Sequence, residues 1–292
     1  MTLSETLVRT GLRVGARVAP DTTARVMAEK FFTVGQRVRV WPQDEPVMAA
    51  ARRETVVLNA RPGGTTDVVT YTWGDGSRTV LLAHGWQSRT SRFGAIITRL
   101  VDDGATVVGF DAPGNGETDG TTSSLLDHLD LISLLAEKQG ELDAIIGHSF
   151  GALAARIAVE EGVPARRVVA IAGPNTFDFL ADTAAVRAGL PPRLLPPMID
   201  RAMQRVLPGT TGAEAAERFH VLRPTSVPLL IVHDDADPEV PLVEAEEHAA
   251  AAGEGAHLLV THGHGHNRVL VAQETVDAVA KFCADSAPQR LT

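Results

Sequence analysis

The sequence predicts an α/β fold: a mostly parallel, twisted sheet with helices on both faces and a helical lid insertion. From about Thr55 onward, short β-branched and apolar runs alternate with longer amphipathic segments, which is typical of strand–helix–strand units. Near the middle of the chain, an apolar strand meets an alanine-rich helix at one sharp, glycine-flanked turn. Residues 175–223 interrupt the alternation with two Pro-Pro pairs and several helical pieces, and they are too long for a simple crossover.

The expected strands and helices follow one another in order along the chain. Strands are expected at residues 55–59, 68–73, 79–83, 106–110, 144–146, 168–172, 228–232 and 256–260. Helices are expected at residues 91–101, 123–140, 243–252 and 273–284, after the central turn, and as a leading pair that ends near residue 32. Ligands bind beyond the carboxyl ends of parallel strands, where the glycine- and histidine-bearing turns of this chain fall.

This pattern divides the chain into four ranges. Residues 1–50 are predicted to form an N-terminal helical extension, and residues 51–174 the first part of the α/β core. Residues 175–223 are predicted to be the lid, and residues 224–292 the second part of the core. A homodimer formed through the N-terminal helices or the lid is a further hypothesis.

Composition narrows the class of protein. The 292 residues are 44% hydrophobic and 22% charged, which suits one large globular domain. The net charge of −9 disfavours binding to nucleic acid or to an anionic membrane surface. Cys283 is the only cysteine, so no internal disulfide forms. No apolar run of about 18 residues predicts a transmembrane segment, and no signal-peptide pattern is present, so a cytoplasmic location is expected.

The central turn is Gly147-His148-Ser149-Phe150-Gly151, which matches G-x-S-x-G. Between a strand and a helix, this pattern places the serine at strained backbone angles with its hydroxyl exposed at the top of the sheet. Gly147 and Gly151 are expected where a Cβ atom would strike the neighbouring strand and helix. Ser149 is therefore predicted to be a nucleophile.

With three other motifs, this turn gives the chain a recognisable resemblance. The motifs are, in order, His84-Gly85-Trp86, Gly109–Gly116, Gly147–Gly151, and the pair His233–Pro241 with Gly263–His266. Over about residues 55–285 the chain resembles the α/β-hydrolase family, and most of all bacterial esterase-like members with a small lid. The family order of nucleophile, acid and histidine is met by Ser149, Asp237 and His266.

The chemistry also follows from the residue types. A serine hydroxyl needs a neighbouring base, here His266, and a buried carboxylate must orient that imidazole. Asp237 is the predicted acid, because it lies just beyond the strand at residues 228–232, in the loop where the family keeps its acid. Asp234 and Asp235 remain alternatives, since sequence does not show which of the neighbouring side chains turns inward.

The histidines near residue 266 allow other interpretations. His262, His264 and His266 alternate, so an extended backbone would place them on one face as a metal site. The glycines between them favour a flexible loop instead, with His264 as the alternative base. His148 is expected to pack or hydrogen bond. No metal is therefore predicted at the run of three histidines. No nucleotide cofactor is predicted either, because neither G-x-G-x-x-G nor a phosphate-binding G-x-x-x-x-G-K-[ST] is present.

A developing oxyanion needs preorganised donors. The backbone N–H groups of Phe150 and Trp86 are predicted to supply them, with Gly85 allowing a close backbone approach. His84 is expected to tie this loop through a hydrogen bond. The turn with Asp111, Gly114 and Gly116 is expected to support the site.

The leading hypothesis is a carboxylesterase-like serine hydrolase that cleaves small or medium acyl esters, with a small-molecule ester as its partner. A thioesterase, lactonase, acyltransferase or carbon–carbon bond hydrolase would use the same triad. A non-catalytic ligand-binding protein on the same fold is the alternative from another class. Apolar lid residues suggest an acyl-binding role or ordinary helix packing: Phe177, Phe179, Leu180, Leu194, Leu195, Met198 and Ile199.

Overall fold

The computed structural model of the chain describes residues 3–62 and 64–284. The chain divides into two compact units, each described below by itself. The helical unit comprises the chain up to Thr33 together with Thr176–His220. The sheet unit comprises Val34–Asn175 and the chain from Val221 onward.

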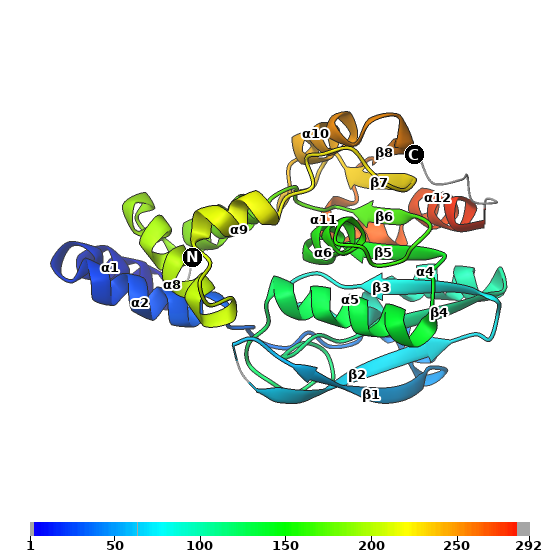
Figure 1. The fold of residues 1–292 in the computed structure, drawn as a ribbon, viewed down its shortest axis with the longest axis horizontal. Coiled ribbons are helices and arrows are strands. Elements are labelled where there is room, and N and C mark those ends of the chain that lie inside the picture. Colours follow the sequence, from blue (N-terminus) through cyan, green and yellow to red (C-terminus); the bar gives the residue numbers. More distant parts are fainter. Residues whose placement is uncertain (1–2, 63, 285–292) are drawn as a thin grey trace. The chain divides into compact units, whose positions relative to one another are not determined.

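Within the described residues, the sheet unit contains one eight-stranded sheet in the order β1-β2-β4-β3-β5-β6-β7-β8 (Figure 1). β2 runs antiparallel to both β1 and β4, and all other neighbouring strands are parallel. The prediction of a mostly parallel α/β sheet is therefore confirmed. The strands are β1 (Arg52–Asn59), β2 (Thr65–Trp73), β3 (Arg78–Ala83), β4 (Ala105–Phe110), β5 (Ala144–His148), β6 (Val168–Ile171), β7 (Leu229–Asp234) and β8 (Ala256–Thr261).

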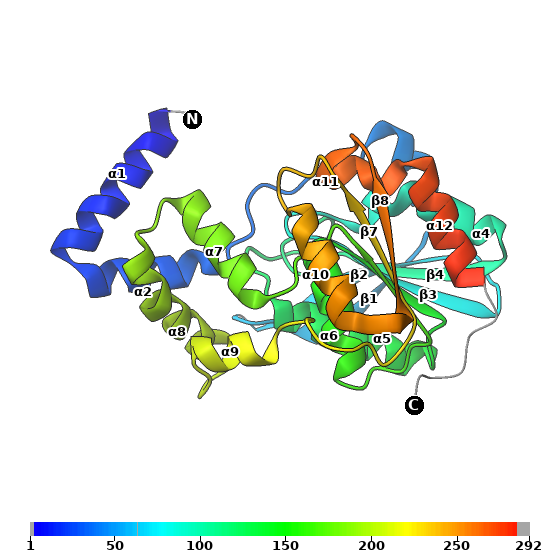
Figure 2. The same cartoon turned by 90° about the horizontal axis from the view of Figure 1, so that it is seen from above.

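Helices cover both faces of this sheet. Figure 2 shows α4 and α12 on one side of the sheet and α5 and α6 on the other. α5 begins at a capping box in which Ser124 and Asp127 exchange hydrogen bonds, which satisfies amides that the first turn leaves unpaired. The helices of this unit are α3 (Glu45–Ala49), α4 (Gly94–Asp102), α5 (Leu125–Gln139), α6 (Phe150–Glu160), α10 (Leu242–Ala252), α11 (Gly265–Arg268) and α12 (Gln273–Ala284).

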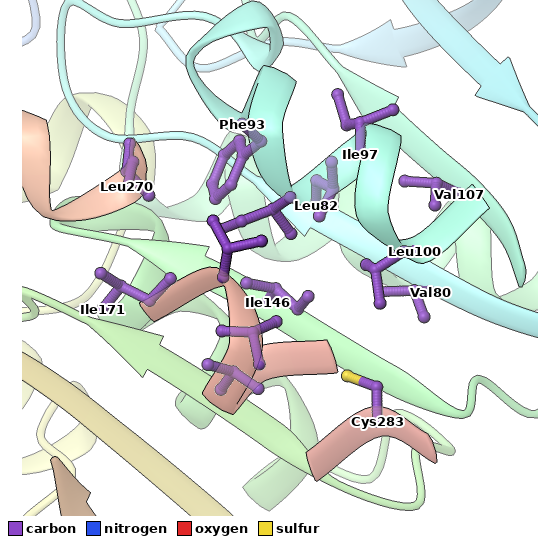
Figure 3. Close-up of a cluster of buried hydrophobic side chains, with 14 of the residues drawn as sticks. Val80, Leu82, Phe93, Ile97, Leu100, Val107, Ile146, Ile171, Leu270 and Cys283 are labelled. Carbon is purple, nitrogen blue, oxygen red and sulfur yellow. The ribbon is translucent and has the colours of Figure 1, made fainter. Parts of the chain in front are cut away.

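A continuous apolar core joins the sheet to α4 and α12 (Figure 3). Val80 and Leu82 alternate along β3 and both enter this core, as the period of two in a strand requires. Cys283 is buried in it, so its thiol packs rather than reacts. Helix and strand residues in the core include Phe93, Ile97, Leu100, Val107, Ile146, Ile171 and Leu270.

The register of the parallel strands gathers four turns at one edge of the sheet. Ala83 at the end of β3 pairs with Gly147 near the end of β5, and Asp234 at the end of β7 pairs with Thr261 at the end of β8. The turns that follow β3, β5, β7 and β8 therefore leave the sheet on the same side. This edge carries the candidate site.

Residues 34–50, which the sequence assigns to an N-terminal extension, lie with the sheet unit. The backbone N–H of Val34 donates to Thr121 O at 2.8 Å, and the indole N–H of Trp73 donates to Val47 O at 2.7 Å. Met48 is part of the apolar core. The segment therefore packs against β2 instead of continuing the leading helices.

The leading helices instead form part of the helical unit, where α2 packs along α8. Arg193 donates to Ala16 O, and Arg201 pairs with Asp21, both at 3.0 Å. Phe177 lies against Phe31. Buried residues of this unit include Phe177, Leu194, Met198 and Ile199 from the predicted apolar set. Its helices are α1 (Leu3–Val18), α2 (Pro20–Phe31), α7 (Phe177–Ala188), α8 (Leu195–Val206) and α9 (Gly212–Arg218).

Candidate active site

Ser149 occupies the turn between β5 and α6 with a φ of 53° and a ψ of −123°. A non-glycine residue at positive φ is strained and persists only where its surroundings hold it. A Cβ atom at Gly147 would lie 2.3 Å from Gly151 O, and one at Gly151 would lie 2.1 Å from Ala83 O. Both glycines are therefore required for the close approach of β5, α6 and the end of β3. The side chain of Ser149 is held partly exposed at this edge.

His266 lies in the one-turn helix α11, and its ring is nearly buried. The Nδ1–H of His266 donates to Asp237 Oδ2 at 2.7 Å. Asp237 Oδ1 accepts hydrogen bonds from the backbone amides of Glu239 and Val240 at 2.8 and 3.0 Å. Burial raises the pKa of Asp237, but the hydrogen bonds from His266 and the two amides outweigh it, so the pKa lies below its ordinary value. The carboxylate therefore stays ionised beside the imidazole.

The two neighbouring aspartates face other partners. Burial opposes ionisation of Asp234, yet its hydrogen bonds lower the pKa to about 2. Asp235 is exposed and pairs with His262 at 2.7 Å. Asp234 thus holds the backbone of the histidine loop, whereas Asp237 alone of the three contacts the ring of His266. The donors to Asp234 are the backbone amides of Ala236, His264 and Gly265 and the hydroxyl of Thr261.

The three alternating histidines do not share a face. His262 and His264 precede α11 and point to different carboxylates, Asp235 and Glu274, while His266 pairs with Asp237. Within residues 3–62 and 64–284, no group of three or more histidine, cysteine or acidic side chains is arranged to hold a metal ion. The extended backbone that a shared metal site requires is replaced here by a turn and a short helix.

The loop after β3 approaches Ser149 closely, since a Cβ atom at Gly85 would lie 3.1 Å from Ser149 Cβ. His84 is fully buried and fixes this loop: its Nε2 accepts from the Ala112 amide at 2.9 Å, and its Nδ1–H donates to Gly85 O at 2.7 Å. In a planar trans peptide the N–H points away from the carbonyl oxygen. Because Gly85 O turns toward His84, the N–H of Trp86 is directed to the opposite side.

Aromatic rings pack behind this loop. The rings of Trp86 and Phe150 lie 5.6 Å apart, and His128 on α5 lies 4.9 Å from Phe150 and 5.2 Å from His84. Sequence analysis missed His128. Its position could have been noticed in the sequence, because His128 lies between Leu126 and Leu129 in the apolar stripe of the helix predicted at residues 123–140.

The arrangement can be compared with known families. A model of the alpha/beta hydrolase family matches residues 80–282, which is more than half of the chain. This chain belongs to the α/β-hydrolase family. No protein among the curated sequences matches it.

Solved structures similar to this hydrolase include an esterase, a lipase and a thioesterase domain. The esterase Pf2001 of Pyrococcus furiosus has a TM-score of 0.63 at 19% identity, over 87% of this chain and all of the other. The monoacylglycerol lipase of Paleococcus ferrophilus has a TM-score of 0.56 at 21% identity, over 74% and 98%. The thioesterase domain of the curacin biosynthetic pathway has a TM-score of 0.56 at 17% identity, over 80% and 100%. At these identities the similarity concerns the fold.

The turn after β4 supports the site of the hydrolase. Asp111 is fully buried and accepts from the Thr90 amide at 2.8 Å and from the Tyr71 hydroxyl and the Glu117 amide at 2.9 Å each. A Cβ atom at Gly116 would lie 1.8 Å from Asp111 Oδ2. These contacts agree with the supporting role predicted for Asp111 and Gly116. None of the helices in the described part of the chain is long and apolar enough to span a bilayer.

Buried histidines make the stability of the hydrolase depend on pH. Burial lowers the pKa of His128, His148 and His248 to about 3, and it also lowers the pKa of His84. In the unfolded chain these groups return to about 6.5. Below that pH the unfolded chain therefore binds more protons than the folded one, and the free energy of unfolding falls.

Two buried carboxyls act in the opposite sense. Burial raises the pKa of Asp44 and Asp127 to about 6, so each adds stability that is complete below about 3.8 and lost as the pH rises through 6. The four histidines outnumber these two carboxyls, and we expect the free energy of unfolding to fall as the pH is lowered from 6 to 4. Urea denaturation at several pH values measures this slope. His128→Phe should make this slope shallower, because it removes one of the buried histidines with a lowered pKa.

Proposed function

We propose that this α/β hydrolase is a serine esterase that cleaves small or medium acyl esters through an acyl-enzyme on Ser149. The observation that carries the proposal is the hydrogen bond between Asp237 and His266, at the same sheet edge as the strained turn of Ser149. A buried carboxylate on Nδ1 fixes the tautomer of the imidazole and leaves Nε2 to accept a proton.

In the proposed reaction, Ser149 Oγ attacks the ester carbonyl carbon as its proton moves to His266 Nε2. The negative charge on the carbonyl oxygen is stabilised by the backbone N–H groups of Phe150 and Trp86. His266 then gives its proton to the departing alkoxide oxygen as the C–O bond breaks. A water molecule attacks the acyl-enzyme and passes its proton to His266, and Ser149 recovers its proton when the acid is released.

The arrangement around Gly85 supports the assignment of Trp86. The His84 ring hydrogen bonds the Gly85 carbonyl and so fixes the orientation of the peptide between Gly85 and Trp86. The N–H of Trp86 is therefore in place before substrate binds. Phe150 is the first residue of α6, where backbone N–H groups have no partner within the helix and the helix dipole favours negative charge. Both donors are main-chain groups and need no side-chain reordering during the reaction.

The proposal is tested by hydrolysis of p-nitrophenyl esters of graded chain length, together with labelling by a fluorophosphonate. We expect turnover with an optimum at a short or medium acyl chain, and labelling that peptide mapping locates at Ser149. A thioester of the optimal chain length, assayed beside the oxygen ester, tests the thioesterase alternative. Folded protein that neither turns over these compounds nor takes the label would contradict the enzyme proposal and favour a binding protein.

A further inference from the structure

His148, the last residue of β5, connects the serine turn to the histidine loop. Its side chain is 2% exposed, and its Nε2 lies 2.8 Å from the backbone carbonyl oxygen of His266. The two imidazole rings are 4.9 Å apart. The side chain immediately before Ser149 is thus bonded to the main chain of the residue that pairs with Asp237.

The direction of this hydrogen bond is fixed, because a carbonyl oxygen only accepts. Nε2 of His148 therefore carries the proton, and Nδ1 carries the lone pair, with no hydrogen-bond partner in the described part of the chain. Burial, and then the proximity of His266, lower the pKa of His148 to about 3. The ring is therefore neutral at pH 7 and adds no positive charge beside His266.

Other contacts that restrain the same loop come from the end of β7. Asp234 accepts from the Gly265 amide at 2.8 Å, and Asp237 accepts from the His266 ring. These contacts place the loop relative to β7, which is separated from β5 by β6. The bond from His148 is different, since it connects the loop directly to β5, the strand that leads into the turn of Ser149.

We propose that His148 is a positioning residue that sets the separation between Ser149 and His266 through its hydrogen bond to the His266 carbonyl. The inference rests on the proposed function, since it assigns His148 a part in the same reaction. Misplacement of a reacting group by about 1 Å can lower a rate by about 100-fold. His148 is buried, so its loss should lower kcat and leave KM for a small ester nearly unchanged.

Three substitutions separate positioning from packing. His148→Gln keeps an N–H donor near the place of Nε2, His148→Asn keeps an amide too short to reach it, and His148→Leu removes the donor. We expect kcat for p-nitrophenyl acetate, and the rate of fluorophosphonate labelling, to fall about 100-fold in the Leu and Asn variants and to recover largely in the Gln variant. His248→Leu removes the buried histidine of α10 that accepts from Arg156; it is the control for the loss of a buried imidazole elsewhere and should keep kcat.

The outcomes are distinct. If the wild type is active and Ser149→Ala is inactive, but the Leu and Asn variants keep full kcat, the positioning role is overturned and the esterase proposal stands. A parallel loss of kcat in the Gln variant and in the His248 control would also overturn it, because packing alone would then explain the effect. If the wild type neither turns over nor labels, the positioning role falls with the proposed function. Should His148→Leu fail to fold, the Gln and Asn pair decides.

Discussion

Replacing Ser149 by alanine is expected to lower kcat for p-nitrophenyl esters by about a million-fold and to leave the fold intact. The substitution removes only Oγ, the atom that would form the acyl-enzyme, and keeps the Cβ atom within the turn. Steady-state assays of matched preparations measure kcat, and thermal unfolding followed by circular dichroism measures stability.

Ser149→Gly is the informative companion variant. It should be equally inactive, but its unfolding temperature should exceed that of Ser149→Ala, because glycine adopts a φ of 53° without a Cβ penalty. Turnover that survives in either variant would contradict the assignment of Ser149 as the nucleophile. An unfolding temperature lower in Ser149→Gly than in Ser149→Ala would contradict the inferred strain.

Asp237→Asn is expected to lower kcat by about 10,000-fold, since an amide can present its N–H₂ to the ring and favour the wrong tautomer of His266. Neither neighbouring carboxylate is placed to compensate. Asp234 accepts from the backbone around His264 and Gly265, and Asp235 pairs with His262. The loss should therefore be much larger than in a site with an alternative acid.

Two matched amide substitutions complete this test. Asp235→Asn should keep kcat within a few-fold, because its exposed pair with His262 contributes little. Asp234→Asn should mainly lower the unfolding temperature, because the amide N–H₂ would face groups that donate. If Asp235→Asn or Asp234→Asn abolished turnover in folded protein while Asp237→Asn retained it, the acid would be misassigned.

Sequence patterns sufficed for the sheet and for the turn of Ser149, because both depend on local periodicity and on glycine sterics. They favoured Asp237 as the acid but left Asp234 and Asp235 as alternatives. That choice depends on which donors face each carboxylate, and the Gly265 amide and the His266 ring lie about thirty residues further along the chain. The hydrogen bond from His148 to His266 joins residues 118 positions apart, so the residue pattern near either histidine does not predict it.

The packing of the N-terminal residues could not be predicted either, because their partners also lie far away in the sequence. Residues 1–50 are predicted as one N-terminal extension with a helix pair that ends near residue 32, but only the part up to Thr33 joins α8 in the helical unit. The segment from Val34 onward packs on the sheet unit instead, with Met48 in its core. Helical periodicity identifies an apolar face but does not name the surface that covers it.

The pairing of α2 with α8 has a consequence for the order of synthesis. α2 ends at Phe31 and must wait for the synthesis of α8, which begins at Leu195, before the two helices can pack together. At about 5–20 residues per second this delay lasts roughly ten seconds or more. α2 is thus an element made early in a unit that is completed late.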